Sequence, residues 1–281
     1  MSEIRLAIVG AGNCASSLVQ GLDYYREEDR SGLIQQEIGG YRVADIRVVA
    51  VFDVDERKVG KPLGTALRAE PNCTPWFARD LSGEGPVVQM GPVLDGVAPH
   101  MADYPAAESF RPAQLEPVDV VKVLRDTRAN VLINYLPVGS EQAVRFYAEA
   151  CLEAGARFIV APWVDATLAA PVQEAGACLM LGALTPTEVR AALQAGADVV
   201  KIFPAGSVGG PAHIKALRAV FPDVAFCPTG GVDARNAPDY LAAGAAFVGI
   251  GGKLVDEALV AAGDRAAVMR AAEDALGIMR A

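Results

Sequence analysis

A lysine stands inside an apolar run near residue 200, in the stretch ADVVKIFPAGSVGG. Two valines precede Lys201 and the pair Ile202-Phe203 follows it, a pattern typical of a buried strand, where an unpaired ammonium ion is costly. Apolar surroundings favour the neutral amine. A neutral amine attacks a ketone and forms an iminium ion, which draws electrons from the neighbouring C–C bond. The pattern therefore indicates a Schiff-base nucleophile; the alternative is a lysine whose long side chain reaches solvent.

A second chemical pattern lies in the N-terminal stretch RLAIVGAGNCASSLVQGL, where an apolar strand runs through Gly10 and Gly12 into an amphipathic helix. The first glycine permits a tight turn, the second admits a pyrophosphate, and the small Ala15 lets helix and strand pack closely. Asp53, at the end of the next apolar run, is suited to accept a hydrogen bond from a ribose 2′-hydroxyl, which favours NAD over NADP. The alternative is an ordinary strand–helix turn with a polar residue at a strand end.

Paired glycines follow two later apolar runs, in Thr229-Gly230-Gly231 and in Gly251-Gly252-Lys253. Consecutive glycine amides can form a concave anion site, and the amine of Lys253 adds a positive charge to the second turn. Both turns are therefore predicted to bind phosphate. The alternative is that both are ordinary turns between a strand and a helix.

The composition restricts the function further. The chain has 281 residues, a net charge of −9 and 52% hydrophobic residues, which favours a globular α/β protein and argues against a nucleic-acid or anionic membrane partner. No apolar run approaches the ~18 residues of a membrane-spanning helix. Five cysteines without a C-x-x-C spacing and only two histidines predict no metal site. The expected location is a reducing cytoplasm.

Eight short apolar runs alternate with amphipathic stretches, which predicts parallel strands covered by helices. They are RLAIVGAG, IRVVAVFDVD, NVLINYLPVG, ARFIVAP, CLMLGAL, DVVKIFPA, VAFCPTGG and AAFVGIGG. From about residue 150 an Ala-Gly-Ala phrase precedes several strands, with glycines 21 and then 20 residues apart (Gly155, Gly176 and Gly196). This period is typical of βα-barrel units, whereas irregular insertions at 22–45 and 70–117 are typical of a Rossmann sheet. We therefore predict an α/β chain with a Rossmann-like parallel sheet in residues 1–157 and a partial (βα)8, TIM-type barrel in residues 158–281.

The first portion resembles the bacterial myo-inositol-3-phosphate synthases, through AIVGAGNCASSLVQGLDYY, AVFDVDERKVG, LDGV and INYLPVGSEQAVRFYAEACLEAG. The resemblance covers residues 3 to about 155. It implies an NAD site with two groups of residues. Those that hold the cofactor would be Gly10, Gly12, Asn13, Cys14, Ala15 and Asp53, and those beside the nicotinamide would be Tyr135, Leu136 and Pro137. The synthase's own catalytic domain is not recognisable after residue 157.

The second portion resembles the 2-keto-3-deoxy-6-phosphogluconate aldolases, through LTPTEVRAALQAGADVVKIFPAGSVGG, FPDVAFCPTGGVDARNAPDYLAAG and VGIGG. The resemblance implies that Lys201 is the Schiff-base residue and that Thr185 lines the substrate cavity. Trp163 stands where the family usually has glycine. The family's first three barrel strands are missing, and with them the glutamate that moves protons during catalysis.

The sequence thus predicts a chimera-like chain that joins two kinds of enzyme. The favoured function is a class I aldolase, a lyase that acts on a 2-keto-3-deoxy sugar phosphate, releases pyruvate and is catalytically impaired unless Glu188 or Asp165 replaces the missing carboxylate. One alternative is an NAD-dependent synthase-like isomerase, and another is a non-catalytic natural or engineered fusion that only binds NAD or phosphate. A homo-oligomer is compatible with this prediction, and the strand at residues 157–161 is compatible with either sheet.

Overall fold

The computed structural model describes residues 3–26, 33, 37–38, 40–97, 99–233 and 235–250. Within these residues the chain divides into two compact units between Ala156 and Arg157. Both units are mixed α/β structures built on parallel sheets, as the apolar runs predict.

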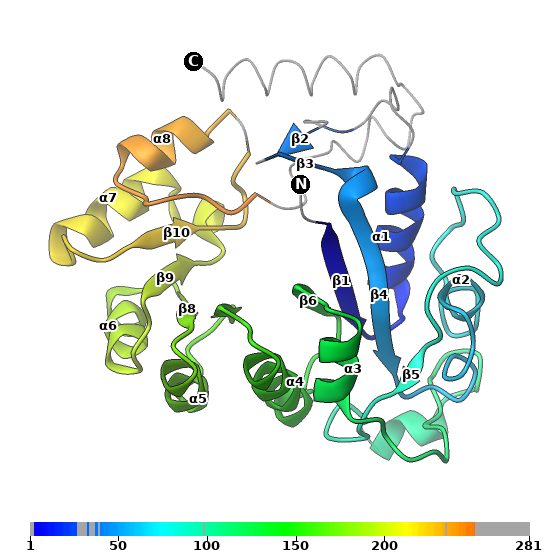
Figure 1. The fold of residues 1–281 in the computed structure, drawn as a ribbon. Helices are drawn as coiled ribbons and strands as arrows, with labels where there is room; N and C mark the ends of the chain where they lie inside the picture. The colour runs from blue at the N-terminus through cyan, green and yellow to red at the C-terminus, as the bar shows by residue number, and fades with distance from the viewer. Residues whose placement is uncertain are drawn as a thin grey trace. The chain divides into compact units, whose positions relative to one another are not determined.

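The first unit contains a four-stranded parallel sheet in the order β5-β4-β1-β6 (Figure 1). Its strands are β1 (Ile4–Val9), β4 (Ile46–Asp53), β5 (Gln89–Met90) and β6 (Val131–Asn134). In chain order, β4 pairs with one side of β1, β5 pairs with β4, and β6 then pairs with the other side of β1. Two short strands, β2 (Glu37–Ile38) and β3 (Tyr41–Arg42), pair antiparallel in the predicted insertion.

Helices cover both faces of this sheet. Alternate residues of a strand point to opposite faces, so one strand contacts helices on both sides. Leu6 and Ile8 of β1 pack with α1 (Asn13–Tyr24) and α2 (Leu63–Ala66). Ala7 and Val9 pack with α3 (Val120–Asp126) and α4 (Glu141–Glu153). The short 3₁₀ turns η1 (Val43–Asp45) and η2 (Pro99–Asp103) lie in the irregular segments. A strand buried on both faces explains why its sequence reads as a continuous apolar run.

The second unit has a four-stranded parallel sheet in the sequential order β10-β9-β8-β7. Its strands are β7 (Phe158–Val160), β8 (Cys178–Ala183), β9 (Val199–Ile202) and β10 (Phe226–Pro228). Its helices are α5 (Ala169–Glu174), α6 (Pro186–Gln194), α7 (Pro211–Val220) and α8 (Ala237–Ala242), with 3₁₀ turns η3 (Ala166–Leu168) and η4 (Ala205–Val208). The strand near residues 157–161 therefore joins the second sheet, where β7 pairs with β8.

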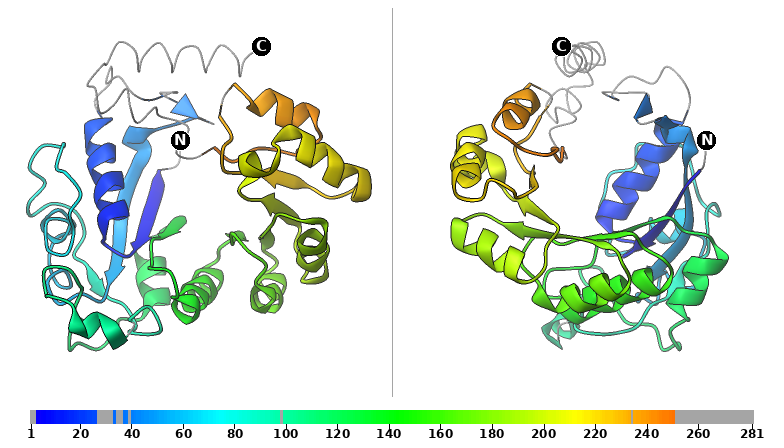
Figure 2. Two further views of the ribbon diagram at one scale, coloured as in Figure 1. Left: turned by 180° about the vertical axis from the view of Figure 1, so that it is seen from behind. Right: turned by 60° about the vertical axis from the view of Figure 1, so that its left-hand side comes forward.

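The four helices described in the second unit, α5 to α8, lie on one face of its sheet (Figures 1 and 2). Leu179, Leu181, Val200 and Ile202 are fully buried, and they alternate along β8 and β9 with partly buried residues such as Met180 and Lys201. Alternation places this second set on the face that these helices leave uncovered. On β7, Phe158 and Val160 are 63% and 43% exposed.

The glycines of the Ala-Gly-Ala phrases, including a fourth at Gly244, lie at the ends of helices. Gly155, Gly176, Gly196 and Gly244 all have positive φ angles, directly after α4, α5, α6 and α8. Glycine adopts this left-handed conformation without a Cβ clash.

Seven of the eight predicted runs contain strands. In the eighth, AAFVGIGG, Gly249 forms a single parallel bridge with Thr229, and Gly251 and Gly252 lie outside the described residues.

Candidate functional site

The glycine turn of the first unit is shaped by close backbone contacts. Gly10 has φ +89°, and a Cβ there would lie 3.1 Å from the backbone oxygen of Tyr135. Around Gly12 the space is open, since a Cβ would meet nothing within 4 Å. No side chain caps the N-terminus of α1, and its first turn holds no acidic residue. This combination fits an anion at exposed helix amides.

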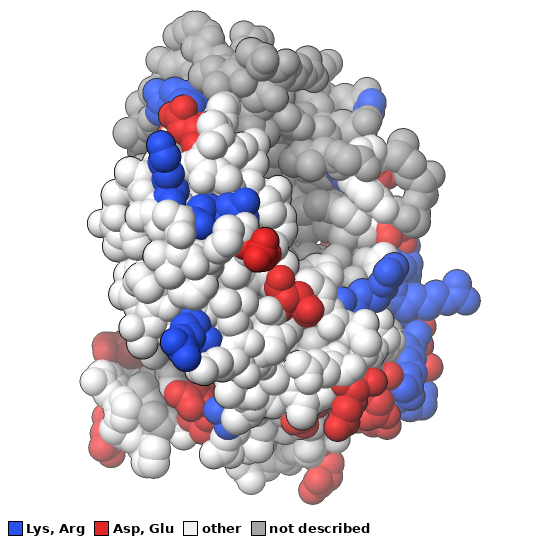
Figure 3. All heavy atoms as spheres, turned by 90° about the vertical axis from the view of Figure 1, so that its left-hand side faces the viewer, with Lys and Arg blue, Asp and Glu red and all other residues white. Residues whose placement is uncertain are grey.

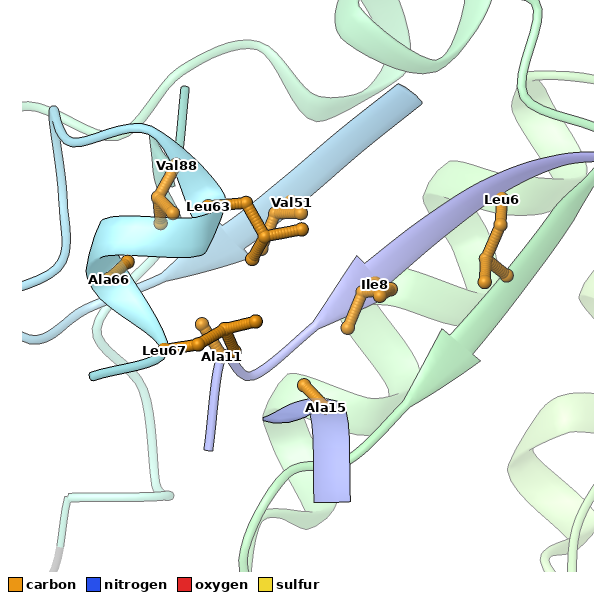
Figure 4. Packing of buried hydrophobic residues seen from close by; sticks show 9 residues of the cluster. All are labelled: Leu6, Ile8, Ala11, Ala15, Val51, Leu63, Ala66, Leu67 and Val88. Carbon is orange, nitrogen blue, oxygen red and sulfur yellow. The ribbon is translucent and has the colours of Figure 1, made fainter. Parts of the chain in front are cut away.

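The small residues of this turn pack into the core (Figure 4). Ala11 and Ala15 are fully buried and belong to one cluster with Ile8 and Val51. Ala15 brings α1 close to β1, the packing role expected for the third small position of the motif.

Asp53 is held at the end of β4 by three backbone N–H groups. Ala11 donates to Oδ2 at 2.7 Å, while Val54 and Asp55 donate to Oδ1 at 2.7 and 2.8 Å. A carboxylate offers about four acceptor positions, so one position on Oδ2 remains for a ligand hydroxyl. The carboxylate therefore fixes the glycine turn and keeps room for a ribose.

A pocket of about 210 Å³ opens between the ends of β1, β4 and β6. It brings together most of the residues predicted for the NAD site: Gly10, Gly12, Asn13, Asp53, Tyr135, Leu136 and Pro137. Cys14 is exposed and Ala15 is buried in the core, and neither lines this pocket. The open glycine turn and the prepositioned carboxylate fit a dinucleotide such as NAD.

Asn13 acts mainly through its side chain. Its Oδ1 accepts hydrogen bonds from the backbone N–H groups of Cys73 and Thr74, at 2.8 and 3.0 Å, and from the Thr74 hydroxyl. The predicted cofactor residue thus ties the start of α1 to a segment of the irregular 70–117 section.

Several pocket residues escaped the sequence analysis. Lys58 is only 4% exposed, and its Nζ donates to Asn72 Oδ1 at 2.9 Å. Removal from water lowers the pKa of Lys58, against the opposing effects of Asp53 and Asp55. Tyr147 of α4 is 3% exposed, and its burial raises the pKa of the phenol, with Asp53 adding to the effect. The segment 70–117 supplies further walls, among them Pro92, Leu94 and Phe110.

In the second unit, Lys201 lies in β9 between Gly182 of β8 and Cys227 of β10. Register partners in a parallel sheet share a face. Lys201 Nζ is 5.2 Å from the centroid of the Phe203 ring. Among the described residues no carboxylate forms an ion pair or hydrogen bond with this amine.

The two neighbours of Lys201 differ in what they contribute. A Cβ on Gly182 would lie 2.0 Å from the backbone oxygen of Pro162, so the loop after β7 rests on this glycine. Cys227 is 4% exposed; burial raises the pKa of its thiol, whereas Thr229 and Lys201 act in the opposite direction. Trp163 follows Pro162 in the same loop and is 51% exposed.

Gly230 and Gly231 follow β10 with φ angles of +82° and +76°. The start of η4 contacts this turn through the backbone: Gly206 N donates to Gly230 O at 2.8 Å, and Ala205 N donates to Thr229 O at 2.9 Å. The backbone N–H groups of both glycines have no acceptor within the described part of the chain. Within the described residues, this turn therefore leaves two backbone amides available to an anion. The other predicted phosphate turn, Gly251-Gly252-Lys253, lies outside the described residues.

Thr185 and Glu188 form the capping box of α6. Glu188 Oε2 accepts from Thr185 N at 2.7 Å, from Leu184 N at 2.9 Å and from the Thr185 hydroxyl at 3.0 Å. These bonds lower the pKa of Glu188, that from Thr185 N most. Asp165 caps η3 by accepting from Thr167 N at 3.0 Å. Both carboxylates proposed as replacements for the missing glutamate are thus engaged at helix starts.

The described residues hold no cluster of three or more potential metal ligands and no helix able to span a membrane. On the face drawn in Figure 3, charges of both signs are separated by broad uncharged areas. All five cysteines are free thiols.

The fold and these two sites define a mixed α/β protein with a strand lysine in one unit and a glycine turn in the other. The family model of KDPG and KHG aldolases matches residues 113–271, more than half of the chain, and the protein therefore belongs to this aldolase family. The match begins upstream of the boundary between the two units.

Individual relatives match different parts of the chain. An inositol-3-phosphate synthase of Mycolicibacterium smegmatis is 48% identical over 161 residues, 56% of this chain and 43% of the relative. A 2-dehydro-3-deoxy-phosphogluconate aldolase of Pseudomonas aeruginosa is 38% identical over 124 residues, 44% of this chain and 56% of the relative. The crystal structure of Ari2 matches with 32% identity and a TM-score of 0.48, over 69% of this chain and 59% of that chain. The chimera-like resemblance is confirmed, and the chain spans less than half the length of the synthase.

Proposed function

We propose that the second unit is a Schiff-base aldolase portion in which Lys201 is the nucleophile. The observation that carries the proposal is a lysine in an apolar strand without a carboxylate partner among the described residues. An amine that no carboxylate engages keeps its Nζ available to attack a carbonyl carbon. The substrate class is a 2-keto-3-deoxy sugar phosphate, the class named for the aldolase relative.

The chemistry then runs through Lys201 Nζ. Its lone pair attacks the C2 carbonyl carbon, and the resulting carbinolamine loses water to give an iminium ion. Cleavage of the C3–C4 bond sends its electron pair into the iminium, which becomes an enamine, while the C4 hydroxyl loses its proton and the aldehyde leaves. Protonation at C3 and addition of water then release pyruvate and the free amine. The amides of Gly230 and Gly231 would hold the substrate phosphate.

We expect turnover to be slow. Each proton transfer needs an acid or base, and the two carboxylates considered as replacements for the missing glutamate, Asp165 and Glu188, serve as helix caps. Loss of a positioned acid–base group costs roughly 10²–10⁴-fold. The sheet order β10-β9-β8-β7 agrees with a partial barrel, for which neighbouring strands must follow one another in the chain.

Borohydride reduction in the presence of pyruvate tests this proposal. The expected result is a covalent adduct on Lys201, located by peptide mass spectrometry, which Lys201→Met abolishes. Lys215→Met, which removes an exposed lysine of α7, serves as the control and should leave the adduct intact. A folded protein whose Lys201 stays unmodified would overturn the Schiff-base assignment and favour a non-catalytic role.

A second function is favoured by the first unit: binding of NAD by a Rossmann-like portion spanning residues 1–157. The strand order β5-β4-β1-β6 places the third, second, first and fourth parallel strands side by side, as in dinucleotide-binding folds. NAD, when bound, supplies a hydride acceptor. Gly10 and Gly12 would admit its pyrophosphate and Asp53 would orient a ribose.

Titration calorimetry with NAD tests the second function. The wild-type chain should bind NAD, and Asp53→Ala should weaken binding by ~1–3 kcal/mol through loss of a charged hydrogen bond. Thermal melting of both proteins checks that they are folded. Absence of heat of binding with folded wild-type protein would remove the NAD assignment and the isomerase alternative with it.

A further inference from the structure

The turn after β4 carries two basic residues with very different partners. Arg57 has several partners, because its guanidinium donates four hydrogen bonds, to both carboxylate oxygens of Asp55 and to the backbone oxygens of Ala106 and Ser109. Lys58 donates to Asn72 Oδ1 and to no other acceptor among the described residues. An ammonium group has three N–H donors. Two donors of a nearly fully buried lysine are therefore unused within the described chain, at a pocket that this lysine lines.

Asn72 fixes where this amine lies. Its amide donates to Ala11 O at 2.9 Å and to Leu67 O at 3.1 Å, which leaves its oxygen to Lys58. Ala11 in turn donates to Asp53, so the amine and the carboxylate are linked through the same glycine turn. Both groups also belong to the same turn after β4 and line the same pocket.

Asp53, Asp55 and Glu56 contribute three negative charges to residues 53–58, and Arg57 and Lys58 contribute two positive charges, a net charge of −1. Glu56 is exposed and does not line the pocket. Asp55 and Arg57 neutralise each other in a direct ion pair of 2.7 Å. Asp53 and Lys58 remain as the pair of opposite charges that faces a ligand. Among the residues that line the pocket, removal of the Asp53 charge would leave the Lys58 ammonium, with its unused donors, as the one charged side chain.

We propose that Lys58 and Asp53 together determine whether the site binds NAD or NADP. Lys58 is able to bind a 2′-phosphate, and the negative charge of Asp53 prevents it from doing so. The inference rests on the proposed dinucleotide site. With Asp53 present, its charge repels a 2′-phosphate and its free oxygen position accepts a ribose hydroxyl. Without that charge, the Lys58 amine binds the 2′-phosphate, the group that separates NADP from NAD.

The test is a double-mutant comparison by calorimetry on the full chain, with NAD and NADP as the two probes. The variants are Asp53→Ser, Lys58→Gln and the double substitution, with Lys61→Gln as a control that removes an exposed lysine of the same segment. Asp53→Asn provides a second route, because its amide oxygen can still accept from Val54 and Asp55. Thermal melting accompanies each titration.

The measured quantity is the ratio of the NADP and NAD dissociation constants, which a general loss of folding does not change. We expect Asp53→Ser to shift the ratio toward NADP by about tenfold or more, since removing a like charge relieves strong repulsion. Adding Lys58→Gln should reverse that shift, and Lys61→Gln should not.

An Asp53→Ser shift that persists in the double variant would overturn the role of Lys58, as would the absence of any shift in both Asp53 variants. Wild-type protein that binds neither dinucleotide would instead remove the underlying site, an outcome that the wild-type titration alone identifies.

Discussion

Asp53 and Lys201 both place an ionisable group in a parallel strand, but the two side chains differ in how many polar partners the described residues give them. Asp53 accepts three backbone hydrogen bonds and is fixed to the turn that it would serve. Lys201 has an aromatic ring at 5.2 Å and no acidic partner among the described residues. The difference follows from the work proposed for each group. A binding carboxylate gains from being preorganised in its charged form, whereas a nucleophilic amine must be able to lose its proton.

The sharpest test of the Lys201 surroundings is Gly182→Ala. A new Cβ would lie 2.0 Å from Pro162 O and 2.6 Å from Trp163 N, so the strand or the loop has to move. We expect a destabilisation of about 3 kcal/mol or more, at the upper end of overpacking effects, measured by chemical denaturation of the full chain.

The matched control is Gly21→Ala in α1, where a Cβ meets nothing within 4 Å. Alanine is the better helix former, and this variant should gain up to about 1 kcal/mol. Equal stability of the two variants would show that the loop after β7 does not rest on Gly182 as described.

The sequence predicted the strands well where the run of apolar residues was long. β1, β4 and β8 were recognisable because burial on both faces, or repeated turn glycines, leaves a continuous signal. The two-residue β5 and the pocket walls in 70–117 were not recognisable, since they depend on contacts between distant segments. Lys58 is the clearest case: it stands in the charged phrase DERKVG, which suggests solvent, and its burial depends on Asn72, 14 residues later.

The second prediction compares the two charged groups directly through stability. Asp53→Ala leaves three backbone N–H groups without their acceptor and should destabilise the protein by ~1–3 kcal/mol. Lys201→Met replaces an amine that has no acidic partner among the described residues with an apolar side chain of similar length, and it should leave stability unchanged or slightly raised. Equilibrium unfolding in urea measures both. A marked loss of stability in Lys201→Met would reveal a partner for the amine and break the contrast.

In contrast to the burial of Lys58, the capping box of α6 is recognisable from the sequence. Thr185 and Glu188 have the Ser/Thr-x-x-Glu spacing, with proline at the first helical position, which is a helix-start signal. Considering Glu188 only as a proton-transfer group overlooked that signal. The bonds from Leu184 and Thr185 identify its structural role.

The smallest expected effect comes from this cap and concerns pH. Glu188 has a pKa below its usual 4.5 in the folded protein, because backbone N–H groups bind the carboxylate. The unfolded chain therefore takes up a proton at higher pH than the folded chain does. The stabilisation is present above pH 4.5 and is lost as the pH falls through the folded-state pKa.

Glu188→Gln should lower the melting temperature slightly at pH 7 and flatten its decline below pH 4.5. Glu174→Gln, an exposed glutamate at the end of α5, should keep the wild-type slope. If both variants show the same acid profile, the cap does not bind the carboxylate in its ionised form, and Glu188 again becomes a candidate for the missing proton-transfer group.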